Sequence, residues 1–217
     1  MVTLVIAWGL CNNWPRWRFI SVCWPYHVGS ELVLLHLIRH PRLDIAPGIC
    51  YGQSDIVANH AHCLQLADEL RLLLPENLSV ISSPSQRCQT LAHMLHPAPE
   101  LDARLMEKHF GNWEMQAWDE IPRAEIDAWV LDVIAYAPAG GESVLMMARR
   151  VLSFLMSLPM RADLPRSELV LLTHGGPSSM ILAYQFGMTA EDLASAVAKK
   201  RKSLDFGECV QVQIKLC

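Results

Sequence analysis

Arginine and histidine side chains occur at three places in this sequence where an apolar run ends. Arg39 and His40 close one run, Arg87 lies shortly after a second, and His174 closes a third. Phosphoryl transfer needs positive charge around three equatorial oxygens and a nucleophile in line with the leaving group. Arginine supplies forked hydrogen bonds to such oxygens, and a neutral imidazole, kept unprotonated by nearby guanidinium charge, is a competent nucleophile. The four residues therefore predict phosphoryl transfer through a histidine, provided that the fold brings them together.

Each of the three fragments also has an ordinary structural interpretation. A buried strand often ends in Arg-His without any catalytic role, and Ser-Ser-Pro-x-x-Arg is commonly a capped helix that carries a solvated arginine. Thr-His-Gly-Gly is commonly a turn at the end of a strand. The joint occurrence of the three fragments, in this order and in these contexts, favours the catalytic interpretation.

The elements that would position these residues are buried strands separated by helices. The apolar runs 32–38, 78–81 and 169–173 have the length and composition of strands that are buried on both faces. Apolar spacing, capping residues and glycine or proline breaks predict helices over 57–74, from 82–84 to Leu95, over 118–133, over 142–158 and from Pro177 onward. The alternating segment 209–214 predicts an edge strand.

This alternation predicts an α/β fold, namely a three-layer α/β/α sandwich with a mostly parallel central sheet. In such a sheet the active site lies beyond the carboxyl ends of the strands. Arg39, His40, Arg87 and His174 all fall at that edge. We therefore expect their side chains to converge on one anionic group of a substrate.

Four stretches of the chain resemble the histidine phosphatase superfamily, also called phosphoglycerate mutase-like. The stretches are 37–41 (LIRHP), 82–90 (SSPSQRCQT), 104–114 (RLMEKHFGNWE) and 172–176 (LTHGG), and the match covers most of 31–216. The resemblance implies that His40 is the phosphorylated nucleophile. Arg39 and Arg87 would hold the phosphate, and His174 would add hydrogen bonds to it. The same resemblance implies that Glu107 is the proton donor.

Glu114 is the competing carboxylate in this resemblance, and we interpret it, within its Gly-x-Trp-Glu segment, as structural support. Many members of the superfamily read Arg-His-Gly-Glu-Thr at the nucleophile, whereas this chain has Pro41 in place of the glycine and Leu43 in place of the threonine. Proline lacks a backbone donor and fixes one torsion angle. The difference concerns details of the phosphate pocket and leaves the two arginines and two histidines intact.

The loop 46–55 resembles that of the alpha-ribazole phosphatases of the cobalamin pathway. It leaves the first strand beside the expected phosphate pocket, so its side chains can line the space of the leaving group. Tyr51 offers an aromatic face that either stacks on a planar base or packs the loop. We expect Tyr51 and Gln53 to bind the substrate.

The expected activity is hydrolysis of a phosphomonoester in two steps, with attack by His40 and protonation of the leaving alkoxide by Glu107. The resemblance implies alpha-ribazole 5′-phosphate or adenosylcobalamin 5′-phosphate as substrate, in the assembly of the cobalamin nucleotide loop. A phosphoglycerate mutase, a broad-specificity phosphatase and a catalytically silent phosphate-binding protein on the same fold are the alternatives. The short segment between Glu107 and His174 leaves little room for the insertions that close a mutase site, which favours hydrolysis.

Composition limits the partners of this chain. Of the 217 residues 52% are hydrophobic and only 18% are charged, which is typical of a packed globule. The net charge of −4 argues against a general nucleic-acid binder, and no apolar run approaches the ~20 residues that span a bilayer. We expect a small phosphorylated partner, no nucleic acid and no membrane. No metal or other cofactor is expected, because arginine and histidine charge can neutralise the phosphate.

The ends and the cysteines bear on location and domain organisation. The seven cysteines include no Cys-x-x-Cys pair, which predicts reduced thiols in a cytoplasmic protein rather than disulfides or a zinc site. The tryptophan-rich segment 1–30 predicts an N-terminal extension ahead of a domain at 31–217. Its basic residues follow the apolar run, which disfavours a signal peptide. The basic run 199–202 predicts a solvated helix face, with attraction of an anionic ligand as the alternative.

Overall fold

The computed structural model describes residues 19–20, 31–76, 78–160, 168–200 and 202–216. These residues form an α/β fold around a six-stranded sheet in the order β1-β6-β2-β5-β3-β4. The strands are β1 (Phe19–Ile20), β2 (Glu31–Arg39), β3 (Ser79–Ser82), β4 (Glu100–Leu101), β5 (Glu168–Thr173) and β6 (Cys209–Leu216). Within this sheet only the β2–β6 pair is antiparallel. The mostly parallel sheet is therefore confirmed.

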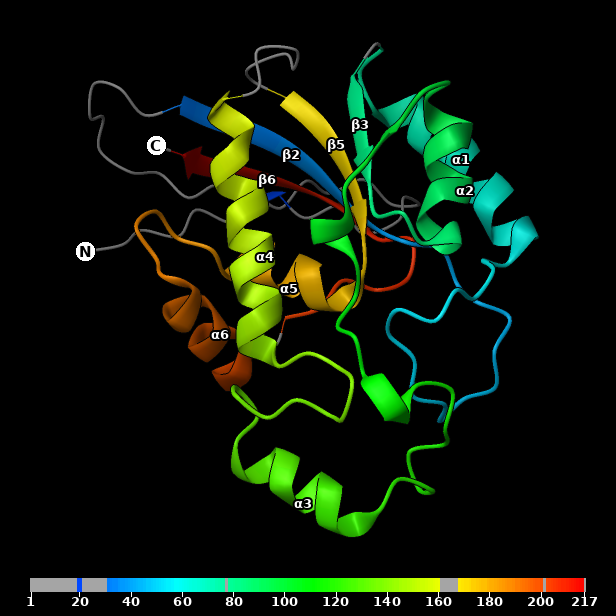
Figure 1. The fold of residues 1–217 in the computed structure, drawn as a ribbon. Coiled ribbons are helices and arrows are strands. Elements are labelled where there is room, and N and C mark those ends of the chain that lie inside the picture. The colour runs from blue at the N-terminus through cyan, green and yellow to red at the C-terminus, as the bar shows by residue number, and fades with distance from the viewer. Residues whose placement is uncertain (1–18, 21–30, 77, 161–167, 201, 217) are drawn as a thin grey trace.

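Helices cover both faces of the sheet, as Figure 1 shows. The helices are α1 (His60–Leu73), α2 (Gln86–Leu95), α3 (Arg123–Leu131), α4 (Val144–Ser157), α5 (Gly175–Ala183) and α6 (Ala190–Lys199), with the short 3₁₀ helices η1 (Ala103–Leu105), η2 (Gly111–Trp113) and η3 (Leu158–Met160). α1 and α2 pack on one face, while α4, α5 and α6 pack on the other. α3 lies apart from the sheet, at the bottom of Figure 1. The three-layer arrangement is confirmed.

Side chains of the central strands alternate between the two hydrophobic cores. In β5, Leu169 and Leu171 pack with residues of α4, α5 and α6, whereas Val170 and Leu172 pack with residues of α1 and α2. All four side chains are buried. Because helices cover both faces, the strand sequence is an unbroken apolar run rather than an alternating one.

The pairing register decides which residues meet at the edge of the sheet. Arg39 pairs with Thr173 where β2 meets β5, and Ser82 pairs with Leu172 where β3 meets β5. β5 thus lies between β2 and β3, with all three strands parallel. The residues that directly follow these strands therefore lie side by side at one edge.

Two helices begin later than the sequence predicts. α1 begins at His60 rather than at residue 57, because the side chain of Asn59 accepts a hydrogen bond from a backbone N–H of the first turn and caps the helix there. α2 begins at Gln86, with Ser85 at its N-cap position, so the predicted start at 82–84 is wrong. Arg87 still lies in the first turn of α2, as predicted.

Two further helix boundaries differ from the prediction. α3 begins after Pro122 and ends at Leu131, so the predicted helix over 118–133 is too long. α5 begins at Gly175, two residues before the predicted start at Pro177, with His174 at its N-cap position. The N-terminus of α5 therefore lies directly beside one of the predicted catalytic histidines.

The prediction of an edge strand over 209–214 is wrong. β6 extends to Leu216 and lies between β2 and β1, because the two residues of β1 pair with it in parallel. Apart from these two residues, the predicted extension 1–30 lies outside the described residues. The boundary between an extension and a domain at residue 31 therefore stays a prediction.

Candidate active site

The predicted catalytic residues meet at the carboxyl edge of the sheet. Arg39 ends β2 and His40 follows it, while His174 follows β5. The ring centroids of His40 and His174 are 5.1 Å apart. The side chain of Arg87, from α2, reaches His174 and is completely buried. Topology thus brings together the two histidines and two arginines that lie far apart in the sequence.

The hydrogen bond of His40 fixes which of its ring nitrogens can react. Nδ1 of His40 lies 2.8 Å from the carbonyl oxygen of Pro41. Since a carbonyl oxygen only accepts, the ring proton resides on Nδ1 and the lone pair resides on Nε2. Pro41 lacks an N–H, but its carbonyl group sets the tautomer of the neighbouring histidine. Nε2 is therefore the nucleophilic atom that this arrangement offers.

Burial and nearby charge keep His40 neutral. Burial, followed by the positive charge of Arg87 and then that of Arg39, lowers the pKa of His40 from 6.5 to about 3, although the hydrogen bond to Pro41 acts in the opposite direction. The imidazole is therefore unprotonated at neutral pH, as a nucleophile must be.

Arg87 connects the end of β5 to the loop after β2. Its Nε donates to Nδ1 of His174 at 3.1 Å, its Nη1 donates to the carbonyl oxygen of Ser54 at 2.8 Å, and its Nη2 donates to the carbonyl oxygen of Gly52. Because Nδ1 of His174 accepts, the proton of that ring resides on Nε2, which lies 2.7 Å from Oγ of Ser83. Burial and the charge of Arg87 hold the pKa of His174 well below its ordinary value.

Arg39 is oriented by the segment that leads into β6. Its Nη1 donates to the carbonyl oxygen of Leu204 at 2.6 Å and to Oγ of Ser203 at 3.4 Å. The guanidinium carbon lies 4.0 Å from the ring centroid of Phe206, and this ring also lies 5.4 Å from the ring of His40. The sequence analysis missed Ser203, Leu204 and Phe206, because loop residues that contact an arginine carry no recognisable sequence pattern.

The carboxylate of Glu107 lies on the N-terminus of α5. Oε2 accepts a hydrogen bond from the backbone N–H of Gly176 at 3.0 Å, and Oε1 accepts one from that of Lys108 at 2.8 Å. A Cβ atom at Gly176 would lie 2.1 Å from Oε1 of Glu107. Only glycine therefore allows the carboxylate to approach the helix N-terminus so closely.

Glu114 has a different environment, as the sequence interpretation expects. Its carboxylate accepts five hydrogen bonds, four from backbone N–H groups and one from the Ser54 hydroxyl; the backbone donors are Gly52, Gln53, Ser54 and Phe110. Burial alone would raise the pKa of Glu114, but these hydrogen bonds hold it below its usual value. A carboxylate so fully occupied stabilises the loop after β2, which supports the structural interpretation.

The two predicted substrate-binding residues lie beside the catalytic set. Nε2 of Gln53 donates to the backbone carbonyl oxygen of Glu107 at 3.1 Å, so this amide already supports the glutamate segment. The ring centroid of Tyr51 lies 5.8 Å from the guanidinium carbon of Arg87. Burial raises the pKa of Tyr51, against the positive charges of Arg39 and Arg87. Contact of either side chain with a substrate stays a prediction.

Metal ligands, membrane spans and cysteines can be surveyed in the part of the chain that the structure describes. There, no group of three or more His, Cys, Asp or Glu side chains is arranged to hold a metal ion, and no helix is long and apolar enough to cross a membrane. Cys50, Cys63, Cys88 and Cys209 are buried and free.

The chain is similar to known proteins in sequence and in fold. The model of the histidine phosphatase superfamily (branch 1) matches residues 35–200. None of the curated proteins compared matches the chain. Among solved structures, the alpha-ribazole phosphatase from Shigella flexneri is 24% identical, with a TM-score of 0.68, over 82% of this chain and 88% of that one.

Two other solved structures resemble the chain to a similar degree. A putative alpha-ribazole-5′-P phosphatase from Escherichia coli is 22% identical, with a TM-score of 0.70, over 83% of this chain and 90% of that one. The mycobacterial glucosyl-3-phosphoglycerate phosphatase is 21% identical, with a TM-score of 0.64, over 85% of this chain and 90% of that one. At these identities the likeness shows a common fold.

The buried neutral histidines predict an acid-sensitive fold. His40 titrates at about 3 in the folded chain and near its ordinary 6.5 when unfolded, so between these values the unfolded state binds a proton that the folded state excludes. We expect the free energy of unfolding to fall as the pH falls below about 6.5, by at most about 1.4 kcal/mol per pH unit for this one residue. Urea unfolding between pH 7 and pH 5 measures this slope. It should be shallower in His40→Ala, and identical slopes in the two proteins would contradict the assignment.

Proposed function

Because the chain belongs to the histidine phosphatase superfamily, we propose that it hydrolyses phosphomonoesters through a phosphohistidine at His40. The observation that carries the proposal is the state of this residue. Its proton is held on Nδ1 by Pro41, and burial, followed by two guanidinium charges, lowers its pKa and keeps it neutral. The lone pair on Nε2 is thus available at neutral pH, next to the positive charge that a phosphate requires.

In the first proposed step, Nε2 of His40 attacks phosphorus and the ester P–O bond breaks. Arg39 and Arg87 neutralise the oxygens of the transferred group, and the N–H groups at the start of α5 add their dipole. An alkoxide is a poor leaving group, so Glu107 gives it a proton. The products of this step are a free alcohol, a phosphohistidine and the carboxylate of Glu107.

In the second proposed step, the same carboxylate takes a proton from water. The resulting hydroxide attacks phosphorus, the P–N bond breaks, and inorganic phosphate leaves. His40 returns to its neutral state with the proton on Nδ1, and Glu107 is protonated again. Acid and base roles thus alternate on one carboxylate, which the N–H of Gly176 holds beside the helix N-terminus.

As substrate we propose alpha-ribazole 5′-phosphate or adenosylcobalamin 5′-phosphate, for use in cobalamin biosynthesis. The likeness of the 46–55 loop to alpha-ribazole phosphatases supports this choice, as do the two structural neighbours of that name. The half-buried ring of Tyr51 lies 5.8 Å from the guanidinium carbon of Arg87, so we expect it to contact a leaving group attached to a phosphate that Arg87 binds. Buried free thiols and a small soluble substrate are consistent with a cytoplasmic enzyme, whose catalytic domain would span 31–217.

A specific observation favours one competing substrate class. The structural similarity to the mycobacterial glucosyl-3-phosphoglycerate phosphatase is of the same order as that to the alpha-ribazole enzymes. Phosphorylated sugar acids are therefore the comparison against which the proposed substrate must be tested. A phosphoglycerate mutase would need an added bisphosphoglycerate, and a silent binding protein would show no turnover.

The nucleophile is tested by removing its imidazole. The turnover rate of His40→Ala should be lower than that of the wild type by about a thousandfold or more, because the substitution removes the covalent step. Incubation with a ³²P-labelled substrate should give an acid-labile, base-stable label on the wild type and none on the variant. Substantial turnover by correctly folded His40→Ala would overturn the covalent mechanism.

The two glutamates are distinguished by their dependence on the leaving group. Glu107→Gln should slow the hydrolysis of alkyl phosphates roughly 10²–10⁴-fold and affect p-nitrophenyl phosphate much less, because p-nitrophenolate leaves without a proton. Glu114→Gln serves as the matched control, since it should lower stability without any such dependence. If only Glu114→Gln shows the dependence, the two roles are reversed.

The substrate is tested by comparing kcat/KM values. We expect a higher kcat/KM for alpha-ribazole 5′-phosphate than for 3-phosphoglycerate, glucosyl-3-phosphoglycerate or simple sugar phosphates. Tyr51→Ala should lower that preference by about tenfold, the order of one lost aromatic contact, while p-nitrophenyl phosphate hydrolysis changes little. An equal or higher kcat/KM for a phosphoglycerate would contradict the proposed substrate, although the assignment as a phosphatase would stand.

A further inference from the structure

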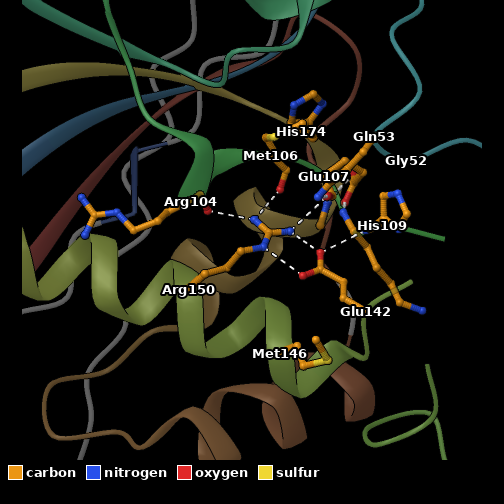
Figure 2. A network of polar contacts seen from close by, with 12 residues as sticks. Gly52, Gln53, Arg104, Met106, Glu107, His109, Glu142, Met146, Arg150 and His174 are labelled. Atoms are coloured by element: carbon orange, nitrogen blue, oxygen red, sulfur yellow. Dashed lines mark hydrogen bonds and ion pairs between the residues drawn. The ribbon is translucent and has the colours of Figure 1, made fainter. Parts of the chain in front are cut away.

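An ion pair outside the predicted site supports the backbone of Glu107. Figure 2 shows Arg150, from α4, reaching the segment that carries this glutamate. Its Nη1 donates to the carbonyl oxygens of Met106 at 2.6 Å and Arg104 at 2.8 Å, and its Nη2 donates to that of Glu107 at 3.0 Å. One side chain thus satisfies three backbone carbonyl groups around the proposed general acid.

Glu142 completes the arrangement from the opposite side. Its carboxylate accepts from Nε of Arg150 at 3.1 Å and also from Nη2. The same carboxylate accepts from the backbone N–H of His109 at 3.0 Å, while the N–H of Glu142 donates to the carbonyl oxygen of His109 at 2.9 Å. Glu142 therefore fixes Arg150 and, at the same time, the backbone that follows Glu107.

The chemistry of the guanidinium explains why this position needs arginine. All five N–H donors of Arg150 are used, two toward Glu142 and three toward carbonyl groups. A lysine ammonium has three donors and no fixed fork, so it could not make the same set. The two side chains are only 18% and 11% exposed, so losing one partner would leave a largely buried charge.

Glu107 is thereby held from two directions. Its backbone is fixed by Arg150 of α4, and its carboxylate is fixed by the N–H of Gly176 in α5. A third contact joins this segment to the sheet, because Oγ1 of Thr173 donates to the carbonyl oxygen of Leu105 at 2.7 Å. The hydrogen bonds of Arg150 do not involve the two histidines or Arg39 and Arg87. Its positive charge is only a smaller contribution, after burial and the charge of Arg87, to the lowered pKa of His174.

We propose that Arg150 and Glu142 are positioning residues, which hold Glu107 where it can protonate the leaving group. This inference rests on the proposed function, since it assigns a role in the proton-transfer step. Displacing a catalytic group by about 1 Å can cost roughly 10²-fold in rate. The penalty should fall on the step that needs the proton and spare substrates that leave without one.

The test compares alkyl phosphates with p-nitrophenyl phosphate. Arg150→Met should lower kcat for alkyl phosphates about 10- to 100-fold with little change in KM, while p-nitrophenyl phosphate turnover and labelling of His40 change little. Arg150→Lys should recover part of the lost rate. Arg149→Met is the matched control, because Arg149 is the neighbouring residue of α4 and forms an exposed pair with Glu191.

A double variant separates positioning from a general structural role. In the Glu107→Gln background, Arg150→Met should cost no further alkyl phosphatase activity, because the acid it positions is already gone. Glu142→Gln, which keeps the shape of the side chain, repeats the comparison if Arg150→Met fails to fold. Equal losses on both substrate types, or additive losses in the double variant, would overturn the inference.

The result for the wild-type protein distinguishes a failure of this inference from a failure of the proposed function. A wild type without phosphatase turnover or phosphohistidine would overturn the proposed function. A wild type that hydrolyses through phosphohistidine, together with an Arg150→Met protein of undiminished alkyl phosphatase activity, would overturn the positioning role alone.

Discussion

The guanidinium of Arg87 is completely buried, and among the described residues it forms no ion pair with a carboxylate. Two carbonyl oxygens and Nδ1 of His174 accept its hydrogen bonds instead. These acceptors take three of its five N–H donors without neutralising its charge. A buried charge without a counter-ion is costly, and the phosphate of the proposed substrate would offset this cost. Burial, followed by this same charge, lowers the pKa of His40 and of His174.

The two glutamates of the segment 104–114 differ in how they relate to this arrangement. Glu114 uses its whole carboxylate to shape the loop that contains Gly52 and Ser54, and this loop presents its carbonyl groups to Arg87. Glu107 accepts only backbone hydrogen bonds, and its position is determined by α4 and α5. The carboxylate of Glu114 thus accepts five hydrogen bonds, whereas that of Glu107 accepts two and keeps further acceptor capacity.

The strands and the residues at their ends could be predicted from the sequence. A strand covered on both faces must be apolar along its whole length, and parallel strands end at one edge, so Arg39, His40 and His174 meet through topology alone. Helix boundaries were harder to predict. α5 begins directly after His174, whose extended backbone, rather than any side-chain cap, starts the helix.

The supporting contacts could not be predicted. Arg39 and Arg150 bind backbone carbonyl oxygens, which every residue carries, so the partners leave no pattern in the sequence. An arginine on an amphipathic helix also looks solvated until the fold shows what it reaches. The interior position of β6 escaped prediction because its neighbour β1 has two residues.

The place of β6 in the sheet also has a consequence for biosynthesis. Arg39 and the carbonyl oxygen of Leu204 that orients it are 165 residues apart in the chain. A ribosome makes the N-terminal part first, so β2 emerges well before its neighbour β6 and before the segment that holds Arg39. Until then β2 has an unpaired edge, which is open to wrong pairing. A nascent chain that stops short of residue 204 therefore contains Arg39 and His40 but lacks the carbonyl group that orients Arg39.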